Sequence, residues 1–476
     1  MILKNEYDLV ILGRGAAAFS AAIKASEITA GQATIAMIGF GPLGGTCVNV
    51  GCVPSKYLIE AAKVAHTQSS PRYPGIEPGH PSINFGELME SLRRTVKEER
   101  TERYENVIKS YENIDVYDGK AQFVDRDAII VKNNSNPKKL KGYNFIIATG
   151  SSTKIPKIEG LNETGYITSN TVWDLNSLPR TLTILGGGFI GLEIGQSLER
   201  LGTKVTIIKE HNTVAPGIEE EIGKTLMEIL TSEGIDFRNG KKILRVYSRN
   251  GKKVVGMKSN LGKEEVEADE ILVSSGRMPN VADLDLEKAG VKYSEKGISV
   301  DETMKTSNPL IYAAGDVVDQ KYRLETLAAS EGSIAASNIY ESNEKRINLQ
   351  LVPWAVFTEP QFASVGLTES QYNATGRKST TRVVPLELVP KARILKEYHG
   401  SFKIVVDSET EKIVGVHALS PYAAEFIIEG VYAIKYGLTF RDLIENSHIF
   451  PTVAEGIKLT SQSFTRDLSR MSCCME

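Results

Sequence analysis

Apolar residues along the chain gather in short runs typical of buried strands, and two of these runs end in a glycine-rich turn. The first run, Tyr7 to Leu12, leads through its turn into an alanine-rich stretch that continues to Ala25. The second, Leu182 to Leu185, leads through a similar turn into an apolar-periodic stretch that ends at Leu201. Each pattern predicts a strand, a tight turn and a helix, in that order.

A further apolar run follows each predicted helix, at Ala33–Ile38 and at Lys204–Ile208, and completes two βαβ units. Between the units, the charged residues 84–113 predict a long helix. Toward the C-terminus, Gly400–Ala418 predicts antiparallel strands and Ala423–Tyr436 predicts an amphipathic helix. The pattern therefore predicts an α/β protein with two Rossmann-like nucleotide-binding domains and a C-terminal α+β domain.

Length, composition and charge fit a globular protein and narrow its partners. The 476 residues correspond to roughly three domains of about 150 residues each. A net charge of -3 argues against a nucleic-acid partner, which a strongly basic surface would favour. No apolar run reaches the ~20 residues that cross a bilayer, and the N-terminus lacks the pattern of a signal peptide. We therefore expect a cytoplasmic protein without membrane contact.

The two glycine turns have the spacing of dinucleotide-binding sites. Small residues there allow a tight turn, a close approach of the backbone to a pyrophosphate, and packing of the helix on the strand. The helix N-terminus then attracts the phosphate charge. The residues with this spacing are Gly13, Gly15 and Ala18 in the first unit and Gly186, Gly188 and Gly191 in the second. Two such motifs in the required context predict two bound dinucleotides.

The residue that follows the second strand of such a unit determines how the ribose of the dinucleotide is bound, because a carboxylate there accepts a hydrogen bond from a ribose hydroxyl. In the first unit this strand runs into Gly39 and Phe40, so the contact must be made otherwise or is missing. In the second unit Lys209 offers a cation for a 2′-phosphate, which favours NADPH over NADH. Glu210 weakens this argument, and a plain surface role for Lys209 stays open.

The four cysteines form two close pairs, Cys47 with Cys52 and Cys473 with Cys474. The first pair lies at a predicted helix N-terminus, which favours thiolate, and Lys56 follows one helical turn beyond Cys52. The adjacent cysteines of the second pair join poorly to each other because the peptide between them strains, but they suit a soft metal ion. These pairs predict redox or soft-metal chemistry, with an inert tail as the alternative for the second.

The segment GGTCVNVGCVPSK at residues 44–56 resembles the active-site motif of the flavin-dependent pyridine nucleotide–disulfide oxidoreductase family. The resemblance includes Ala148–Gly150, Gly276–Asn280 and Thr306–Asp316, and it covers essentially the whole chain. It implies a glutathione reductase-like fold with FAD and NAD(P)H as cofactors. The implied domains are an FAD-binding domain at 1–151 and 269–344, an NAD(P)H-binding domain at 152–268, and a dimerisation domain with the cysteine tail at 345–476.

The resemblance also implies roles for single side chains. Cys52 lies against the flavin and Cys47 meets the substrate, while Lys56 pairs with Glu193 near the flavin. The residues implied to bind FAD are Gly13, Gly15, Ala18, Gly45, Thr46, Lys56, Thr149, Gly150, Asp316 and Thr326, the last of which opens a helix aimed at the flavin. Those implied to bind NADPH are Gly186, Gly188, Phe189, Gly191, Lys209 and Gly276.

The C-terminal region distinguishes the disulfide-reducing members of this family from the mercury-reducing members. Disulfide-reducing members carry a catalytic histidine five residues before a glutamate. Five residues before Glu455 this chain has Phe450, which cannot transfer protons, and His448 is two residues out of place, so we expect a surface or supporting role for it. The paired cysteine tail is similar instead to that of mercury-reducing members, although those commonly have tyrosine where this chain has Phe450.

That similarity implies a reaction and an assembly. Cys473 and Cys474 of one subunit of a homodimer would capture Hg(II), free or as its thiol complexes, and pass it to Cys47 and Cys52 of the other subunit, where Glu455 completes the site. Electrons from NADPH would reach the metal through FAD. Two alternatives stay open: a disulfide reductase like dihydrolipoamide dehydrogenase, and a flavoprotein that binds heavy metal without turnover.

Overall fold

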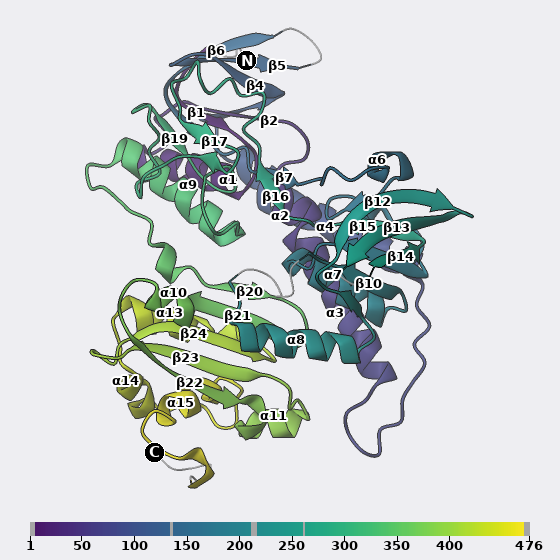
Figure 1. Ribbon diagram of the computed structural model, residues 1–476. Helices are drawn as coiled ribbons and strands as arrows, with labels where there is room; N and C mark the ends of the chain where they lie inside the picture. The colour runs from purple at the N-terminus through teal and green to yellow at the C-terminus, as the bar shows by residue number, and fades with distance from the viewer. Residues whose placement is uncertain (1–4, 134–136, 211–216, 260–261, 471–476) are drawn as a thin grey trace.

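The chain folds into three lobes, which Figure 1 shows as an upper, a right-hand and a lower group of strands. The structure is a computed structural model and describes residues 5–133, 137–210, 217–259 and 262–470. Most strands run parallel in the first two lobes and antiparallel in the third, as the hydrophobic pattern predicts. The predicted fold class is confirmed.

The first lobe is built on a sheet whose central strand, β1 (Glu6–Leu12), pairs in parallel with β2 (Ile35–Gly39) and β6 (Lys138–Ile147). Further strands of this sheet are β3 (Ile114–Asp118), β4 (Lys120–Asp125), β5 (Ala128–Lys132) and β19 (Ile311–Ala313). β19 arrives from much later in the chain and adds in parallel to β6, so the first lobe is completed by a returning segment.

Two helices cover one face of this sheet and pack tightly on each other. They are α1 (Ala16–Ile28), which directly follows β1, and α9 (Glu325–Tyr340), which follows β19. A Cβ atom added to Gly332 of α9 would lie 2.1 Å from the carbonyl oxygen of Ala17, so only glycine permits this crossing. The small side chains of α1 therefore bring α9 against the glycine turn of β1.

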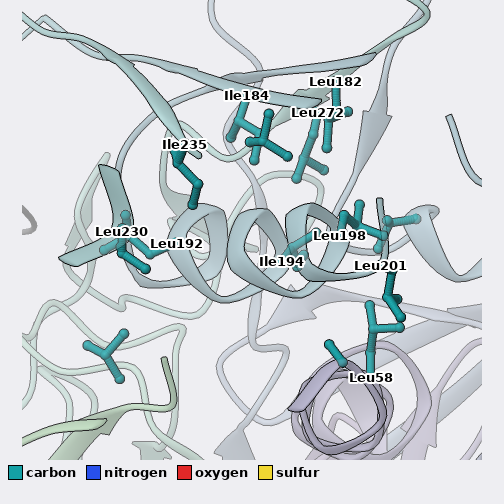
Figure 2. Packing of buried hydrophobic residues seen from close by; sticks show 14 of the residues in the cluster. Leu58, Leu182, Ile184, Leu192, Ile194, Leu198, Leu201, Leu230, Ile235 and Leu272 are labelled. Atoms are coloured by element: carbon teal, nitrogen blue, oxygen red, sulfur yellow. The ribbon is translucent and has the colours of Figure 1, made fainter. Parts of the chain in front are cut away.

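The second lobe repeats the βαβ pattern. Strand β9 (Thr181–Leu185) leads into α7 (Phe189–Arg200) and β10 (Lys204–Ile208), which pairs with β9 in parallel. The rest of the sheet is β8 (Ile167–Thr168), β11 (Asp236–Arg238) and β15 (Glu270–Val273), beside an antiparallel sheet of β12 (Lys242–Arg249), β13 (Lys252–Ser259) and β14 (Gly262–Ala268). Figure 2 shows the leucines of α7 packed between this sheet and Leu58 of the neighbouring lobe.

The first two lobes are joined by a short ribbon and by two helices. The ribbon pairs β7 (Ser151–Thr153) with β16 (Arg277–Pro279). The helices are α3 (Cys52–Ser69) and α4 (Phe85–Arg100), and α4 continues into a π-helical turn (Thr101–Glu105) and α5 (Asn106–Lys109). The long helix predicted at 84–113 is thus interrupted and ends earlier.

The third lobe is an antiparallel sheet flanked by short helices. Its strands are β20 (Trp354–Val356), β21 (Gln361–Gly366), β22 (Ser379–Pro385), β23 (Ser401–Asp407) and β24 (Ile413–Ser420). The helix predicted at Ala423–Tyr436 is divided into α12 (Ala423–Phe426) and α13 (Ile428–Lys435), because the chain tightens at Ile427, whose carbonyl accepts from Gly430 N. Within the described residues, no helix is long and apolar enough to span a membrane.

Candidate active site

The two internal cysteines lie at the start of consecutive helices. Cys47 is in the first turn of α2 (Gly45–Val50), and Cys52 is the first residue of α3. Both are free thiols within hydrogen-bonding reach of each other, and Cys52 is exposed. The hydrogen bond from Cys47 and then the charge of Lys56 lower the pKa of Cys52. The same bond, reinforced by burial, raises the pKa of Cys47. One thiolate is therefore favoured, and it is on Cys52.

Lys56 links the cysteine helix to the second lobe. Its ammonium is 2.9 Å from Glu193 Oε2 of α7 and 4.4 Å above the ring of Phe357. The other oxygen of Glu193 accepts a hydrogen bond from the Phe357 backbone N–H at 2.9 Å. The carboxylate of Glu193 is nearly buried, and both of its oxygens have partners. It holds the Lys56 ammonium beside Cys52. The structure thus brings together the four residues that the motif singled out.

A second carboxylate, which no sequence motif indicated, reaches the cysteines from another helix. Glu325, the first residue of α9, is hydrogen-bonded to the Cys47 thiol, and it accepts from the Tyr104 hydroxyl at 3.4 Å. Burial raises the pKa of Glu325 and of Tyr104. Tyr104 stands in the π-helical turn, and its ring packs edge-on against Phe19. Since these contacts join three distant segments, local sequence pattern carried no signal for them.

The first glycine turn has the shape required by a dinucleotide pyrophosphate. Gly13 has φ of +148°, and a Cβ atom there would lie 2.1 Å from the carbonyl oxygen of Ala148. Helix α1 begins after Gly15, with no side-chain cap and no acidic residue in its first turn, so its N–H groups face an anion freely. Gly45 packs directly on Gly15, which places the cysteine segment beside the turn. Ala18 is buried behind the turn.

The other residues predicted for FAD lie near the ribbon of β7 and β16 and at the start of α9. Asp316 accepts from Ser151 Oγ at 2.5 Å and lies 3.6 Å from Arg277 Nε, while Thr149 Oγ1 donates to the carbonyl of Asn280. Gly150 follows Thr149 in a left-handed conformation, and Thr46 is exposed. The prediction that Thr326 opens a helix is wrong by one residue, because α9 begins at Glu325 and Thr326 is its second residue. No side chain caps the N-terminus of this helix.

The second glycine turn has the same construction. Gly186 has φ of +113°, and a Cβ atom there would lie 2.6 Å from the carbonyl oxygen of Ser274, while Gly191 abuts the same strand end. Helix α7 begins after Gly188 without a side-chain cap or an early acidic residue. The ring of Phe189 stacks on Trp354 at 5.0 Å. Gly276 is exposed on the ribbon beside this turn. These residues fit a second dinucleotide phosphate.

Lys209 lies beneath this second turn and is not a surface residue, so that alternative is wrong. Its side chain is buried against Gly187, with Nζ 3.0 Å from the sulfur of Met227 and 5.7 Å above the Phe237 ring. Burial lowers the pKa of Lys209 to about 8. A pKa of about 8 leaves this ammonium mostly charged at neutral pH, and among the described residues no carboxylate pairs with it, so a bound anion would be stabilised there.

Helix α15 (Glu455–Gln462), which carries the predicted site residue Glu455, lies in the third lobe, away from α2 and α3 of the same chain (Figure 1). Glu455 begins α15 and accepts from Thr452 N at 3.1 Å, and Phe450 is half exposed. The His448 ring is held by Glu429 at 3.0 Å, and this bond raises the pKa of His448. Cys473 and Cys474 lie outside the described residues. Within the part of the chain that is described, no three metal-binding side chains converge.

Sequence comparisons place this arrangement in a class of proteins. The family described as pyridine nucleotide-disulphide oxidoreductase matches residues 7–332, and its dimerisation domain matches residues 352–461. The chain therefore belongs to the pyridine nucleotide-disulphide oxidoreductase family, and members of this family use FAD and NADPH, as predicted.

Two proteins that are similar to this chain over nearly its full length are both named mercuric reductase. The chain is 38% identical to the mercuric reductase of Lysinibacillus sphaericus, over 100% of this chain and 85% of that one. It is 37% identical to the mercuric reductase of Streptomyces lividans, over 98% of each chain. Among solved structures, the Cu(II) complex of the HOCl-induced flavoprotein disulfide reductase RclA from Escherichia coli has a TM-score of 0.85 at 26% identity, over 97% of this chain and 100% of that one.

Proposed function

We propose that this chain reduces Hg(II) to Hg(0) with electrons from NADPH, through FAD and the Cys47–Cys52 pair. The observation that carries the proposal is a reactive dithiol in a chain that lacks a histidine five residues before Glu455. Position 450 is phenylalanine, and Nε2 of His448 bonds to Glu429. Dithiol–disulfide exchange loses typically 10²–10⁴-fold without its acid–base group, whereas a soft metal ion needs only thiolates. The named relatives support the same reaction.

The dithiol performs the binding step. FAD, when bound, supplies the two-electron relay between NADPH and the sulfur pair. The lowered pKa of Cys52 favours thiolate there, and Cys47, which meets the incoming metal, becomes the second ligand once it gives up its proton. Lys56 balances the thiolate charge while Glu193 holds Lys56 in place. Overall, one NADPH and one proton convert a bis-thiol complex of Hg(II) into Hg(0), NADP⁺ and two free thiols.

The tail delivers the metal between subunits. The family's dimerisation domain covers residues 352–461, and a twofold dimer would bring the third lobe of one subunit to the cysteines of the other. Cys473 and Cys474 would then exchange Hg(II) stepwise with Cys47 and Cys52, and Phe450 and Glu455 would line the route. Transfer between equivalent thiol pairs keeps each step near equal free energy, so a tightly bound ion still moves.

Lys209 supports NADPH as the electron donor. Its ammonium is buried under the second glycine turn and pairs with no carboxylate of the described residues, so a 2′-phosphate there would supply an anion. NADH lacks that phosphate and leaves the ammonium uncompensated.

The test is NADPH consumption by the purified holoenzyme with Hg(II), Cu(II), oxidised lipoamide or glutathione disulfide, each under excess thiol. We expect Hg(II)-dependent turnover that falls at least a hundredfold in Cys47→Ser and in Cys52→Ser. The Cys473→Ser/Cys474→Ser variant is the matched control, because it removes two thiols without touching the dithiol. It should keep turnover with small Hg(II) complexes and lose it with bulky ones.

Two results would contradict the proposal. Efficient turnover of a disulfide without Hg(II) would make this chain a disulfide reductase, as RclA from Escherichia coli is described. Tight Hg(II) binding without NADPH oxidation would make it a binding protein.

A further inference from the structure

The first dinucleotide unit lacks the carboxylate that usually bonds the adenosine ribose, and an arginine fills its place. The last residue of β2 is Gly39, which has no side chain to offer. Arg14, between the two glycines of the first turn, extends across Gly39 instead. A Cβ atom added to Gly39 would lie 2.6 Å from Arg14 Cγ and 3.2 Å from its Nε. An acidic side chain at position 39 and an arginine at position 14 therefore exclude each other.

The guanidinium is fixed at its far end. Its Nη1 donates to the carbonyl of Gly41 at 3.0 Å and lies 3.1 Å from Asp118 Oδ1, and its Nη2 donates to the carbonyl of Tyr117 at 2.8 Å. These partners follow β2 and end β3, so the side chain bridges two neighbouring strand ends. Only 10% of the side chain is exposed.

One donor of this buried group is unused. Arg14 Nε has no hydrogen-bond partner among the described residues, although it is shielded from solvent. A buried donor without a partner costs about 1–3 kcal/mol, so such groups normally face a ligand or water. Burial also lowers the pKa of Arg14, which a neighbouring acceptor would offset. The unused N–H sits where a carboxylate at residue 39 would begin.

We infer that Arg14 binds the adenosine ribose of FAD, its Nε–H donating to a ribose hydroxyl oxygen in place of the missing carboxylate. The contact reverses the usual polarity, because the protein becomes the donor and the ribose oxygen the acceptor. The inference concerns the cofactor alone and holds whether or not Hg(II) is the substrate.

The decisive measurement compares three cofactors on the wild-type protein. FAD is removed and the affinities of FAD and of its 2′-deoxyadenosine and 3′-deoxyadenosine analogues are measured by flavin fluorescence. We expect one deoxy analogue to bind about tenfold more weakly than FAD, the ratio of a charge-assisted hydrogen bond. Equal affinity for all three cofactors would overturn the inference without any mutation.

Variants then locate the contact. Arg14→Met keeps the unbranched stem as far as the position of Nε but removes the donors, and we expect it to bind FAD about tenfold more weakly and to lose the preference over the deoxy analogue. Arg126→Met, in an exposed loop of the same lobe, is the matched control and should change neither. Arg14→Ser/Gly39→Glu restores a carboxylate and should recover most of the affinity. A preference retained in Arg14→Met would assign the ribose to another residue.

Discussion

At the scale of single residues, the chemistry depends on an unequal sharing of one proton between two thiols. Lys56 favours thiolate at Cys52, while Glu325 places a second acidic group against Cys47 and opposes thiolate there. Cys47 is therefore held as a thiol until a ligand displaces its proton. Glu325 thus brings a carboxylate from the start of α9 to the dithiol.

Replacing Glu325 by glutamine should lower the pKa of Cys47. The change removes the carboxylate that opposes a thiolate and accepts its hydrogen bond, although the larger influences, the bond to Cys52 and burial, remain. We expect faster alkylation of Cys47 by iodoacetamide at pH 7–8. The clean comparison is Cys52→Ser against Cys52→Ser/Glu325→Gln, which reports Cys47 alone. Glu60→Gln on the exposed face of α3 is the control, and identical pH profiles for the main pair would contradict the expectation.

Some of this site could be predicted from residues and some could not. The spacing of the residues from Cys47 to Lys56 predicts a reactive cysteine pair, whereas Glu193 could be named only from the resemblance to the family. Glu325 and Tyr104 carry no local mark, because their meeting depends on how α9 and the π-helical turn pack. Lys209 was assigned to the correct turn, but its burial could not be read from a strand end with charged neighbours.

At the scale of elements, α9 ties the returning segment to the first glycine turn. Glu331, wholly buried on this helix, accepts from Gly315 N at 2.7 Å, while its other oxygen has no partner among the described residues. The two βαβ units were predictable because strand, turn and helix follow in sequence. The π-helical turn after α4 could not be predicted, because it accompanies a contact between residues far apart in sequence, Tyr104 and Phe19.

The buried carboxyl of Glu331 should make stability depend on pH. Burial raises its pKa to about 7 in the folded protein, from 4.5. Because the folded state holds the proton more tightly, this stabilisation is complete below pH 4.5 and is lost as pH rises toward 7, about 2–3 kcal/mol between pH 5 and pH 8. Glu331→Gln cannot ionise, so its melting temperature should rise relative to wild type over that range at saturating FAD. Parallel curves for both proteins would show that Glu331 is ionised when folded.

The crossing of α1 and α9 should not tolerate a methyl group. In Gly332→Ala the new Cβ meets the Ala17 carbonyl oxygen at 2.1 Å, and backbone cannot move aside as a side chain would. We expect a loss of about 3 kcal/mol of stability and release of FAD at a lower temperature. Gly86→Ala, also in a helix, makes only ordinary contacts and should be neutral or slightly stabilising. Differential scanning fluorimetry of both variants, read by flavin release, checks this.

At the scale of the whole molecule, a buried charge cluster holds the second lobe to the third. Lys403 of β23 lies within 3.2 Å of Glu219, Glu221 and Glu369, and its side chain is 3% exposed. Glu219 and Glu221 flank the start of α8 (Glu220–Ser232), so one lysine binds that helix to the antiparallel sheet. Charges this distant in sequence are invisible to pattern analysis, which predicted both lobes but not their attachment.

Removing the ammonium should loosen this attachment. Lys403→Met leaves Glu219 buried without its cation, and a broken buried pair costs about 3–5 kcal/mol. We expect a lower melting temperature and faster hydrogen exchange in α8 and β23, with FAD retained in the first lobe. Lys412→Met, an exposed lysine of the same sheet, provides the comparison. Unchanged exchange in α8 would mean that other contacts carry the junction.

The arginine that crosses Gly39 also constrains descent. In a lineage that begins with a carboxylate at position 39, arginine at position 14 is barred until that side chain is lost, since both cannot occupy the strand end. Once the arginine is in place, any return of a side chain at 39 is blocked in turn. The two positions therefore change in a fixed order: the carboxylate at 39 is lost before the arginine is gained, and a side chain returns at 39 only after the arginine is lost.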